Sequence, residues 1–154
     1  MSSKYLMKKN VIAGLGEIGT PIYKLLSKNS LSVGYDLNEN LMDLKEFKKY
    51  EDTQTIFLHI CIPFSNKFIS NVQKIIKKFD PEILVIHSTI SPNTTTKLQS
   101  KLKIPIIYSA TRGVHKQMLF DLKRYTKFFA VSSNAPRKKF AVSEFKKLMK
   151  KKWG

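Results

Sequence analysis

The sequence has few of the features that mark secreted, membrane-spanning or disulfide-stabilised proteins. It contains one cysteine in 154 residues, which excludes an internal disulfide. It has no apolar run long enough to cross a bilayer, and its first residues lack the apolar stretch and cleavage site of a secretory signal. We therefore predict a protein of the reducing cytoplasm, with no membrane contact, folded as one domain around one hydrophobic core.

Histidine is also scarce, and its placement argues against a metal centre. The three histidines lack the close spacing of a zinc motif, and the single cysteine cannot supply the missing ligands. His59 stands between Leu58 and Ile60 in an apolar run, so we expect a hydrogen-bonded core histidine. Cys61 follows the same run, where a free cysteine is usually inert packing. No metal site is predicted.

The charge is strongly positive but contains little arginine. The formal net charge is +17, and only Arg112, Arg124 and Arg137 among the 28 basic residues are arginine. Such a charge raises nucleic acid as a partner, but the guanidinium fork suits base reading and phosphate clamping better than lysine does. Most of the lysines are interpreted as a solvated surface, and nucleic acid is not the partner we expect.

Short apolar or β-branched runs alternate with longer amphipathic stretches along the whole chain. This pattern is typical of βαβ units and predicts an α/β fold: a Rossmann-type, doubly wound, mainly parallel sheet of about six strands in a single domain. The expected strands are 10–13, 31–35, 55–62, 83–86, 104–108 and 127–131. The expected helices are 18–29, 38–47 with Asn38 as N-cap, 65–79, 94–102 and a last one after Pro136.

A glycine-rich segment, Gly14-Leu15-Gly16-Glu17-Ile18-Gly19, joins the first expected strand to the first expected helix. In a G-x-G-x-x-G motif the first glycine makes a tight turn, the second lets the backbone approach a pyrophosphate, and the third brings the helix close to the strand. Amide groups at the start of the helix then face the phosphates. An ordinary turn is the alternative, and the order of strand, turn and helix favours a dinucleotide site in residues 10–36.

Asp36 stands 22 residues after Gly14, at the end of the second expected strand. A carboxylate there accepts hydrogen bonds from ribose hydroxyls and repels a 2′-phosphate, so the sequence favours NAD over NADP. No arginine follows Asp36 to offset its charge, and Lys45 lies farther along a helix. The alternative is a plain surface acid at a strand end.

Four stretches in order resemble one enzyme family over nearly the whole chain. They are Gly14–Gly19, Cys61-Ile62-Pro63, the segment HSTISPNTT at 87–95, and Arg112-Gly113-Val114-His115. The chain looks like the N-terminal NAD-binding domain of the UDP-glucose/GDP-mannose dehydrogenase family, which is similar to that of phosphogluconate and hydroxyacid dehydrogenases. The resemblance implies that Pro63, Ser88 and Thr89 border the nicotinamide end of NAD, and that Ile62, beside Pro63, also belongs to the cofactor site. Ser88 and Thr89 also fit a simple strand-ending turn.

The resemblance also implies that chemistry needs more than this chain. In the family, a catalytic cysteine and lysine lie beyond the first domain, and neither can be placed in residues 1–154. We expect an NAD-binding domain of a nucleotide-sugar dehydrogenase-like oxidoreductase, incomplete for catalysis alone, with a nucleotide-sugar substrate bound through another domain or partner. Whether the chain is an enzyme by itself stays open.

Two alternatives to the dehydrogenase domain remain at this point. One is a non-catalytic NAD- or nucleotide-binding module, and the other is a module that docks a partner through its basic last helix. That helix carries apolar side chains that pack either on the sheet or on something outside it: Phe140, Phe145, Leu148, Met149 and Trp153. If they are exposed, we expect a homo-oligomer, most simply a homodimer.

Overall fold

The computed structural model describes residues 7–91, 93–110 and 129–152. The polar stretch with Arg112 and His115, and Trp153, lie outside the described residues. The strands are β1 (Lys9–Ala13), β2 (Ser32–Tyr35), β3 (Thr55–Ile60), β4 (Ile83–Ile86), β5 (Ile106–Tyr108) and β6 (Ala130–Val131). The helices are α1 (Gly19–Ser27), the 3₁₀ turn η2 (Glu39–Leu41), α2 (Leu44–Lys49), α3 (Phe68–Phe79), α4 (Thr94–Lys101) and α6 (Lys138–Lys152).

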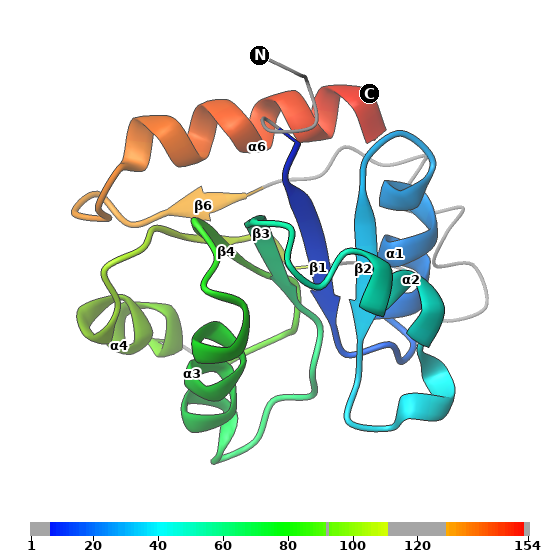
Figure 1. Ribbon diagram of the computed structural model, residues 1–154. Helices are drawn as coiled ribbons and strands as arrows, with labels where there is room; N and C mark the ends of the chain where they lie inside the picture. Colours follow the sequence, from blue (N-terminus) through cyan, green and yellow to red (C-terminus); the bar gives the residue numbers. More distant parts are fainter. Residues whose placement is uncertain (1–6, 92, 111–128, 153–154) are drawn as a thin grey trace.

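The strands form one sheet in the order β2-β1-β3-β4-β5-β6 (Figure 1). All neighbouring pairs are parallel except β5 and β6, which are antiparallel. The chain passes from β1 to β2 on one side and then crosses to β3 on the other side of β1. The order of the strands therefore reverses between β1 and β3, which is the switch point where doubly wound sheets bind ligands.

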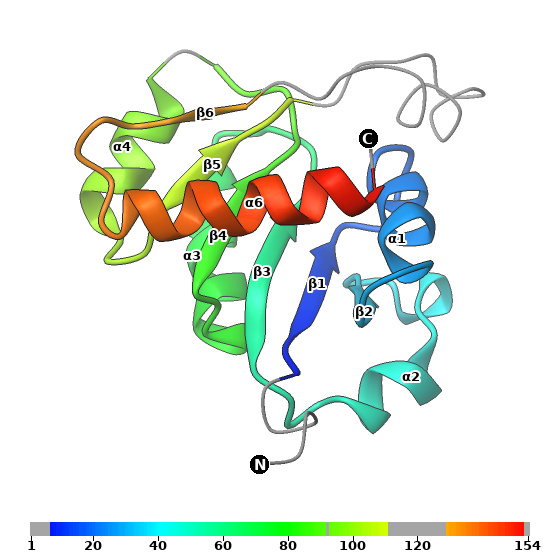
Figure 2. The ribbon, with the colours of Figure 1, turned by 90° about the horizontal axis from the view of Figure 1, so that it is seen from above.

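Helices cover both faces of the sheet, and each face has its own buried cluster. α1 and α6 lie on one face, as Figure 2 shows, and contribute Ile22, Leu26 and Phe145 to a cluster with strand residues such as Ile12. α2, α3 and α4 lie on the opposite face, where Val72 and others pack on the sheet. Strands β1 to β5 are largely buried on both faces, which explains their continuous apolar runs, whereas the edge strand β6 is partly exposed. The predicted α/β, doubly wound, mainly parallel fold is confirmed.

The predicted single helix over 38–47 is wrong. Asn38 does act as a cap, since its side chain accepts a hydrogen bond from the N–H of Asn40 at 3.1 Å, but the 3₁₀ turn it starts ends at Leu41. Asp43 then caps α2 by accepting from the N–H of Glu46 at 3.1 Å. Two good N-cap residues five positions apart divide the segment into two short elements.

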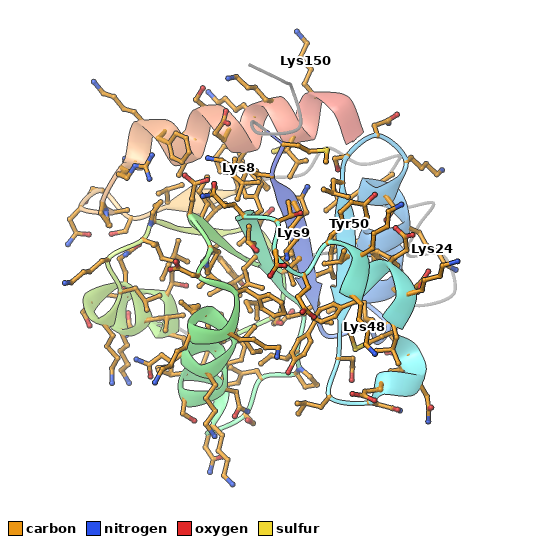
Figure 3. The ribbon with its side chains drawn as sticks, viewed as in Figure 1. Lys8, Lys9, Lys24, Lys48, Tyr50 and Lys150 are labelled. Atoms are coloured by element: carbon orange, nitrogen blue, oxygen red, sulfur yellow. The ribbon has the colours of Figure 1, made fainter. Side chains whose placement is uncertain are left out.

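The apolar face of α6 is covered by the sheet. Phe145 is fully buried and packs edge-to-face with Phe57 and Phe129, and Leu148 is 7% exposed. Lys150 points away from the fold on the other side of the helix (Figure 3). The described part of α6 therefore belongs to the hydrophobic core, and the interpretation of this helix as a partner-docking face loses its main support.

Lys9 differs from the solvated lysines around it. It is 3% exposed, and its Nζ donates to the carbonyl of Tyr50 at 2.7 Å and to that of Glu51 at 3.2 Å (Figure 3). Burial lowers the pKa of the Lys9 ammonium, and the charges of Asp52 and Glu51 oppose this effect. The ammonium ties the start of β1 to the end of α2, so Lys9 is part of the fold and not of the basic surface.

A chain of buried polar side chains crosses β1, β3 and β4 under the α1/α6 face. His59 Nε2 lies 3.1 Å from Asn10 Oδ1, and His59 Nδ1 lies 2.9 Å from His87 Nε2. An amide oxygen only accepts, so Nε2 of His59 donates to Asn10, while the tautomers of the two rings set the direction of the bond between His59 and His87. Both histidines are fully buried. The prediction of a hydrogen-bonded core histidine at position 59 is confirmed.

Replacing Asn10 by leucine is expected to lower the free energy of unfolding by about 1–3 kcal/mol, because it removes the acceptor that faces His59 Nε2 in the core. Urea unfolding followed by circular dichroism measures the loss. Ser30→Ala is the control: it removes the 3.4 Å contact at the other end of the Asn10 amide, together with the bond from the Ser30 hydroxyl to the carbonyl of Leu26 and its contact with Ser32, but it leaves the His59 acceptor in place and should cost less than about 1 kcal/mol. Equal losses in the two variants would contradict a structural role for the Asn10–His59 bond.

Candidate functional site

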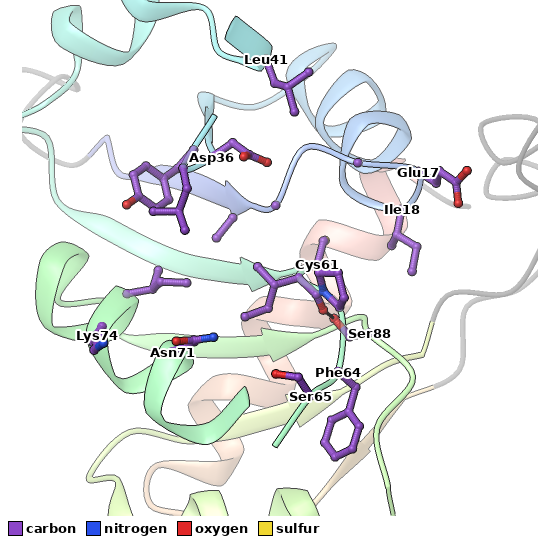
Figure 4. A pocket seen from close by; sticks show the side chains of 18 of the residues that line it. Glu17, Ile18, Asp36, Leu41, Cys61, Phe64, Ser65, Asn71, Lys74 and Ser88 are labelled. Carbon is purple, nitrogen blue, oxygen red and sulfur yellow. Dashed lines mark hydrogen bonds between the residues drawn. The ribbon is translucent and has the colours of Figure 1, made fainter. Parts of the chain in front are cut away.

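A cavity of about 1010 Å³ opens at the carboxyl ends of the strands, at the switch point between β1 and β3 (Figure 4). The turn after β1, the segment after β2 and the loop after β3 border it, together with one face of α3. Its described lining is Ala13, Gly14, Gly16, Glu17, Ile18, Tyr35, Asp36, Leu37, Leu41, Cys61, Ile62, Pro63, Phe64, Ser65, Asn71, Lys74, Ile75, Lys78, Ser88 and Thr89. Much of this lining is apolar, with polar groups at a few points, as in binding sites for cofactors.

The three glycines of the turn have three different environments. Gly14 has φ +98°, and a Cβ there would lie 2.9 Å from the backbone of Cys61. A Cβ on Gly19 would lie 1.6 Å from the Gly14 carbonyl oxygen, so α1 packs directly on the turn. A Cβ on Gly16 would meet nothing within 4 Å and would project into open space. The first and third glycines are required by the fold, whereas the second keeps the turn accessible.

Asp36 is held in place by two backbone hydrogen bonds. Its Oδ2 accepts from the N–H of Leu15 at 2.8 Å, and its Oδ1 accepts from the N–H of Asn38 at 2.8 Å. The first bond joins the end of β2 to the glycine-rich turn, and the second shapes the chain that leaves β2. A carboxylate oxygen can accept more than one hydrogen bond, so both oxygens of Asp36 retain acceptor capacity toward the cavity.

Ser88 and Thr89, at the end of β4, occupy different positions in the wall. The Ser88 hydroxyl is 3% exposed and donates to the carbonyl of Ile62 at 2.5 Å, which ties the loop after β3 to β4. Thr89 is exposed at the cavity. Cys61 is 7% exposed and packs near Gly14 and Gly19. Ser88 therefore shapes the loop that carries Pro63, while Thr89 offers a free surface to a ligand.

The structure brings most of the predicted cofactor-binding residues to one cavity. Those lining it are Gly14, Gly16, Glu17, Ile18, Asp36, Ile62, Pro63, Ser88 and Thr89. Leu15 and Gly19 are outside the lining. The Leu15 side chain is buried in the core beside Gly34, and only its backbone N–H serves the site, through Asp36. Gly19 acts by its close approach to Gly14.

Sequence reasoning missed the wall formed by α3. Asn71, Lys74, Ile75 and Lys78 line the cavity, and their spacing of three, four and seven residues places them on one helical face. The Lys78 ammonium lies 5.5 Å from the centre of the Tyr35 ring. The sequence did contain a signal for this wall: the face of α3 that lines the cavity mixes polar and apolar residues and lies beside the apolar stripe of the helix. Lys74 and Lys78 thus share the cavity with Asp36, whereas Lys45, the nearest base after Asp36 in the sequence, is not among its lining residues.

The described parts of the chain, residues 7–91, 93–110 and 129–152, hold neither a metal centre nor a membrane-spanning helix. The described residues contain no group of three or more histidine, cysteine or acidic side chains placed to hold a metal ion. No helix within these ranges is both long and apolar enough to span a bilayer.

Comparisons with known proteins give matches by structure only. No family model and no curated protein sequence matches the chain. A UDP-D-ManNAc dehydrogenase from Pyrococcus horikoshii matches 94% of this chain with a TM-score of 0.72 and 17% identity. A UDP-N-acetyl-mannosamine dehydrogenase from Staphylococcus aureus matches the same share with a TM-score of 0.66 and 14% identity.

A third similar structure is prephenate dehydrogenase from A. aeolicus, in complex with hydroxyphenyl propionate and NAD+, with a TM-score of 0.68 and 17% identity over 94% of this chain. The matched regions are 44% of the Pyrococcus chain, 45% of the Staphylococcus chain and 57% of the prephenate dehydrogenase chain. The chain therefore spans about half the length of these proteins. At such identities the likeness defines the fold: a Rossmann-type α/β domain of the kind found in larger dehydrogenases.

Proposed function

We propose that this chain is the NAD-binding domain of an oxidoreductase similar to the nucleotide-sugar dehydrogenases. The observation that carries the proposal is the cavity at the switch point, where an open Gly16 and the anchored Asp36 face the same space. A pyrophosphate needs close approach to the turn backbone, and a ribose needs a carboxylate acceptor beyond it. The residues present meet both needs, so they fit a dinucleotide.

Each part of the wall has a task in holding the dinucleotide. The N–H groups of the turn at Gly16 and Glu17 face the pyrophosphate, and Asp36 accepts from the hydroxyls of the adenosine ribose. Pro63, Ser88 and Thr89, on the loops after β3 and β4, border the nicotinamide end. Bound NAD supplies the hydride acceptor, and the chain orients it. The substrate, which we propose is a nucleotide sugar, is held by a further domain or a partner subunit.

Asp36 also gives the reason to propose NAD and not NADP. A 2′-phosphate on the adenosine ribose would lie against this carboxylate, and like charges at close range repel each other. Lys74 and Lys78 line the same cavity and would reduce this repulsion without removing it. The selectivity therefore rests on one side chain, which makes it testable by one substitution.

Calorimetric titration with NAD and NADP tests the proposal. Wild type is expected to bind NAD at least about tenfold more tightly than NADP. Asp36→Asn keeps an acceptor for the N–H of Leu15 but loses the charge, so NAD binding should weaken about tenfold while NADP binding holds or improves. Glu39→Gln, an exposed acid outside the cavity lining, is the matched control and should change neither affinity.

The possible results separate the parts of the proposal. If wild type binds neither dinucleotide, the cavity is not a dinucleotide site and the glycine turn is only architecture. If NAD binds but Asp36→Asn leaves the ratio of the two affinities unchanged, Asp36 does not select the cofactor and the NAD assignment loses its basis.

A further inference from the structure

One side chain of the cavity has a hydrogen-bonding capacity that the proposed contacts leave unused. Asn71, on α3, is half-buried and lines the cavity, and its amide points into the groove (Figure 4). Its backbone N–H donates to Lys67 at 2.9 Å as part of the helix, but its side-chain amide has no hydrogen-bond partner within the described residues. A half-buried amide at a cavity wall is well placed for a ligand that offers both a donor and an acceptor.

The position of Asn71 relative to Asp36 identifies the part of the ligand that it faces. If Asp36 holds the adenosine ribose and the turn at Gly16 holds the pyrophosphate, the base lies on the far side of Asp36 from the turn. There the cavity is bounded by Leu41 after β2 and, opposite it, by α3 with Asn71 and Lys74 (Figure 4), and Leu37, the residue after Asp36, also lines the cavity. Leu37 is 91% exposed and Leu41 is 52% exposed, so both offer apolar surface for a ring to cover.

The chemistry of the α3 wall distinguishes Asn71 from its neighbours. The side chains of Lys74 and Lys78 only donate hydrogen bonds, and that of Ile75 neither donates nor accepts them. Among these four cavity-lining side chains of α3, Asn71 alone combines a donor and an acceptor on one planar group. Adenine presents the same combination in reverse, an exocyclic N6–H donor beside a ring-nitrogen acceptor, and asparagine pairs with this edge through two hydrogen bonds in other proteins.

We infer that Asn71 hydrogen-bonds the adenine edge of the dinucleotide through its amide and selects adenine at this end of the cavity. The inference rests on the proposed function and goes beyond it by assigning base recognition to a residue of α3. Leu37, Leu41 and Ile75 cover the faces of the ring, while Asn71 reads its polar edge.

The test compares NAD with an analogue that differs from it at the polar edge of the adenine ring. In the 1,N6-etheno analogue of NAD, N1 and N6 are tied into an extra ring, so the N6–H donor is lost. Wild type should bind NAD at least about tenfold more tightly than the etheno analogue. Asn71→Leu has a similar volume and should weaken NAD about tenfold while changing the affinity for the analogue little. In this variant the affinities for NAD and for the etheno analogue should therefore become nearly equal.

Two controls make the result specific. Lys74→Met, on the same face of α3, should keep the preference for NAD over the etheno analogue. ADP-ribose has the adenine half of NAD but no nicotinamide. Its affinity for Asn71→Leu should fall, relative to wild type, by about the same factor as the affinity for NAD. Thermal unfolding without ligand verifies that the variants are folded.

The outcomes separate this inference from the proposed function. An unchanged preference in Asn71→Leu overturns the inference, as does a loss confined to NAD with ADP-ribose unaffected, since Asn71 would then contact the nicotinamide half. If wild type binds NAD but does not prefer it over the etheno analogue, only the assignment of Asn71 fails. If wild type binds no NAD, the cofactor proposal fails and the inference falls with it.

Discussion

Gly16→Val is expected to weaken NAD binding more than about 100-fold, or about 2.8 kcal/mol, while changing the free energy of unfolding by about 1 kcal/mol or less. The reason is the open space at this residue. A Cβ on Gly16 meets no atom within 4 Å, so the fold accepts the side chain. The valine methyl groups would occupy the space through which a pyrophosphate approaches the backbone. Calorimetric titration measures the first effect and urea unfolding measures the second.

Gly16→Ala provides a graded control, because one methyl group blocks less of the approach and should cause a smaller loss of affinity. Wild-type affinity in Gly16→Val would show that no ligand crosses the turn at this point. In that case the glycine motif would be purely architectural, and the high positive charge of the surface would become the feature to explain.

The sheet could be predicted from the sequence because most of its strands are buried on both faces. Ile12, Leu58, Leu84 and Ile106 are all fully buried, so the strands appear as short continuous apolar runs separated by amphipathic helices. The glycine motif added the position of the first crossover. The order of the strands and the antiparallel pairing of β6 depend on contacts between distant segments, which local patterns do not report.

Errors arose where two local signals compete or where tertiary position decides. Asn38 and Asp43 are both good N-caps, and the spacing of apolar residues between them did not reveal that each starts its own short element. The α3 wall of the cavity shows the second case. Asn71 and Lys74 have the composition of an ordinary solvated face, and only the placement of α3 across from β2 brings them to the site.

Asp36 shows which properties of a site residue the motif predicts and which it does not. Its spacing from Gly14 predicted a carboxylate at the end of β2, and the structure places it there. The spacing did not reveal that the same carboxylate holds the N–H of Leu15, and therefore stabilises the turn it serves. Binding and turn stability are coupled through this residue, so a substitution of Asp36 acts on both, whereas a substitution of Gly16 separates them.

Gly19→Ala is expected to have the largest effect on stability, a loss of more than about 4 kcal/mol or failure to fold. The added Cβ would lie 1.6 Å from the carbonyl oxygen and 2.8 Å from the carbonyl carbon of Gly14. These are backbone atoms at the junction of β1 and α1, so relief requires the helix to move off the strand and not a side chain to rotate. Ile22 and Leu26, which α1 buries against the sheet, would lose contacts in that movement.

Urea unfolding of Gly19→Ala beside Gly16→Ala tests this difference between two glycines of the same turn. Gly16→Ala should lie within about 1 kcal/mol of wild type, because its Cβ is unobstructed. Adding NAD separates the two effects further. A ligand that binds the folded state raises its stability, by about 2.7 kcal/mol at a hundredfold excess over Kd, so wild type should gain this increment and Gly16→Val should not. Equal stability of Gly19→Ala and Gly16→Ala would contradict the close approach of α1 to the turn, and with it the geometry that directs the N–H groups of the turn toward a pyrophosphate.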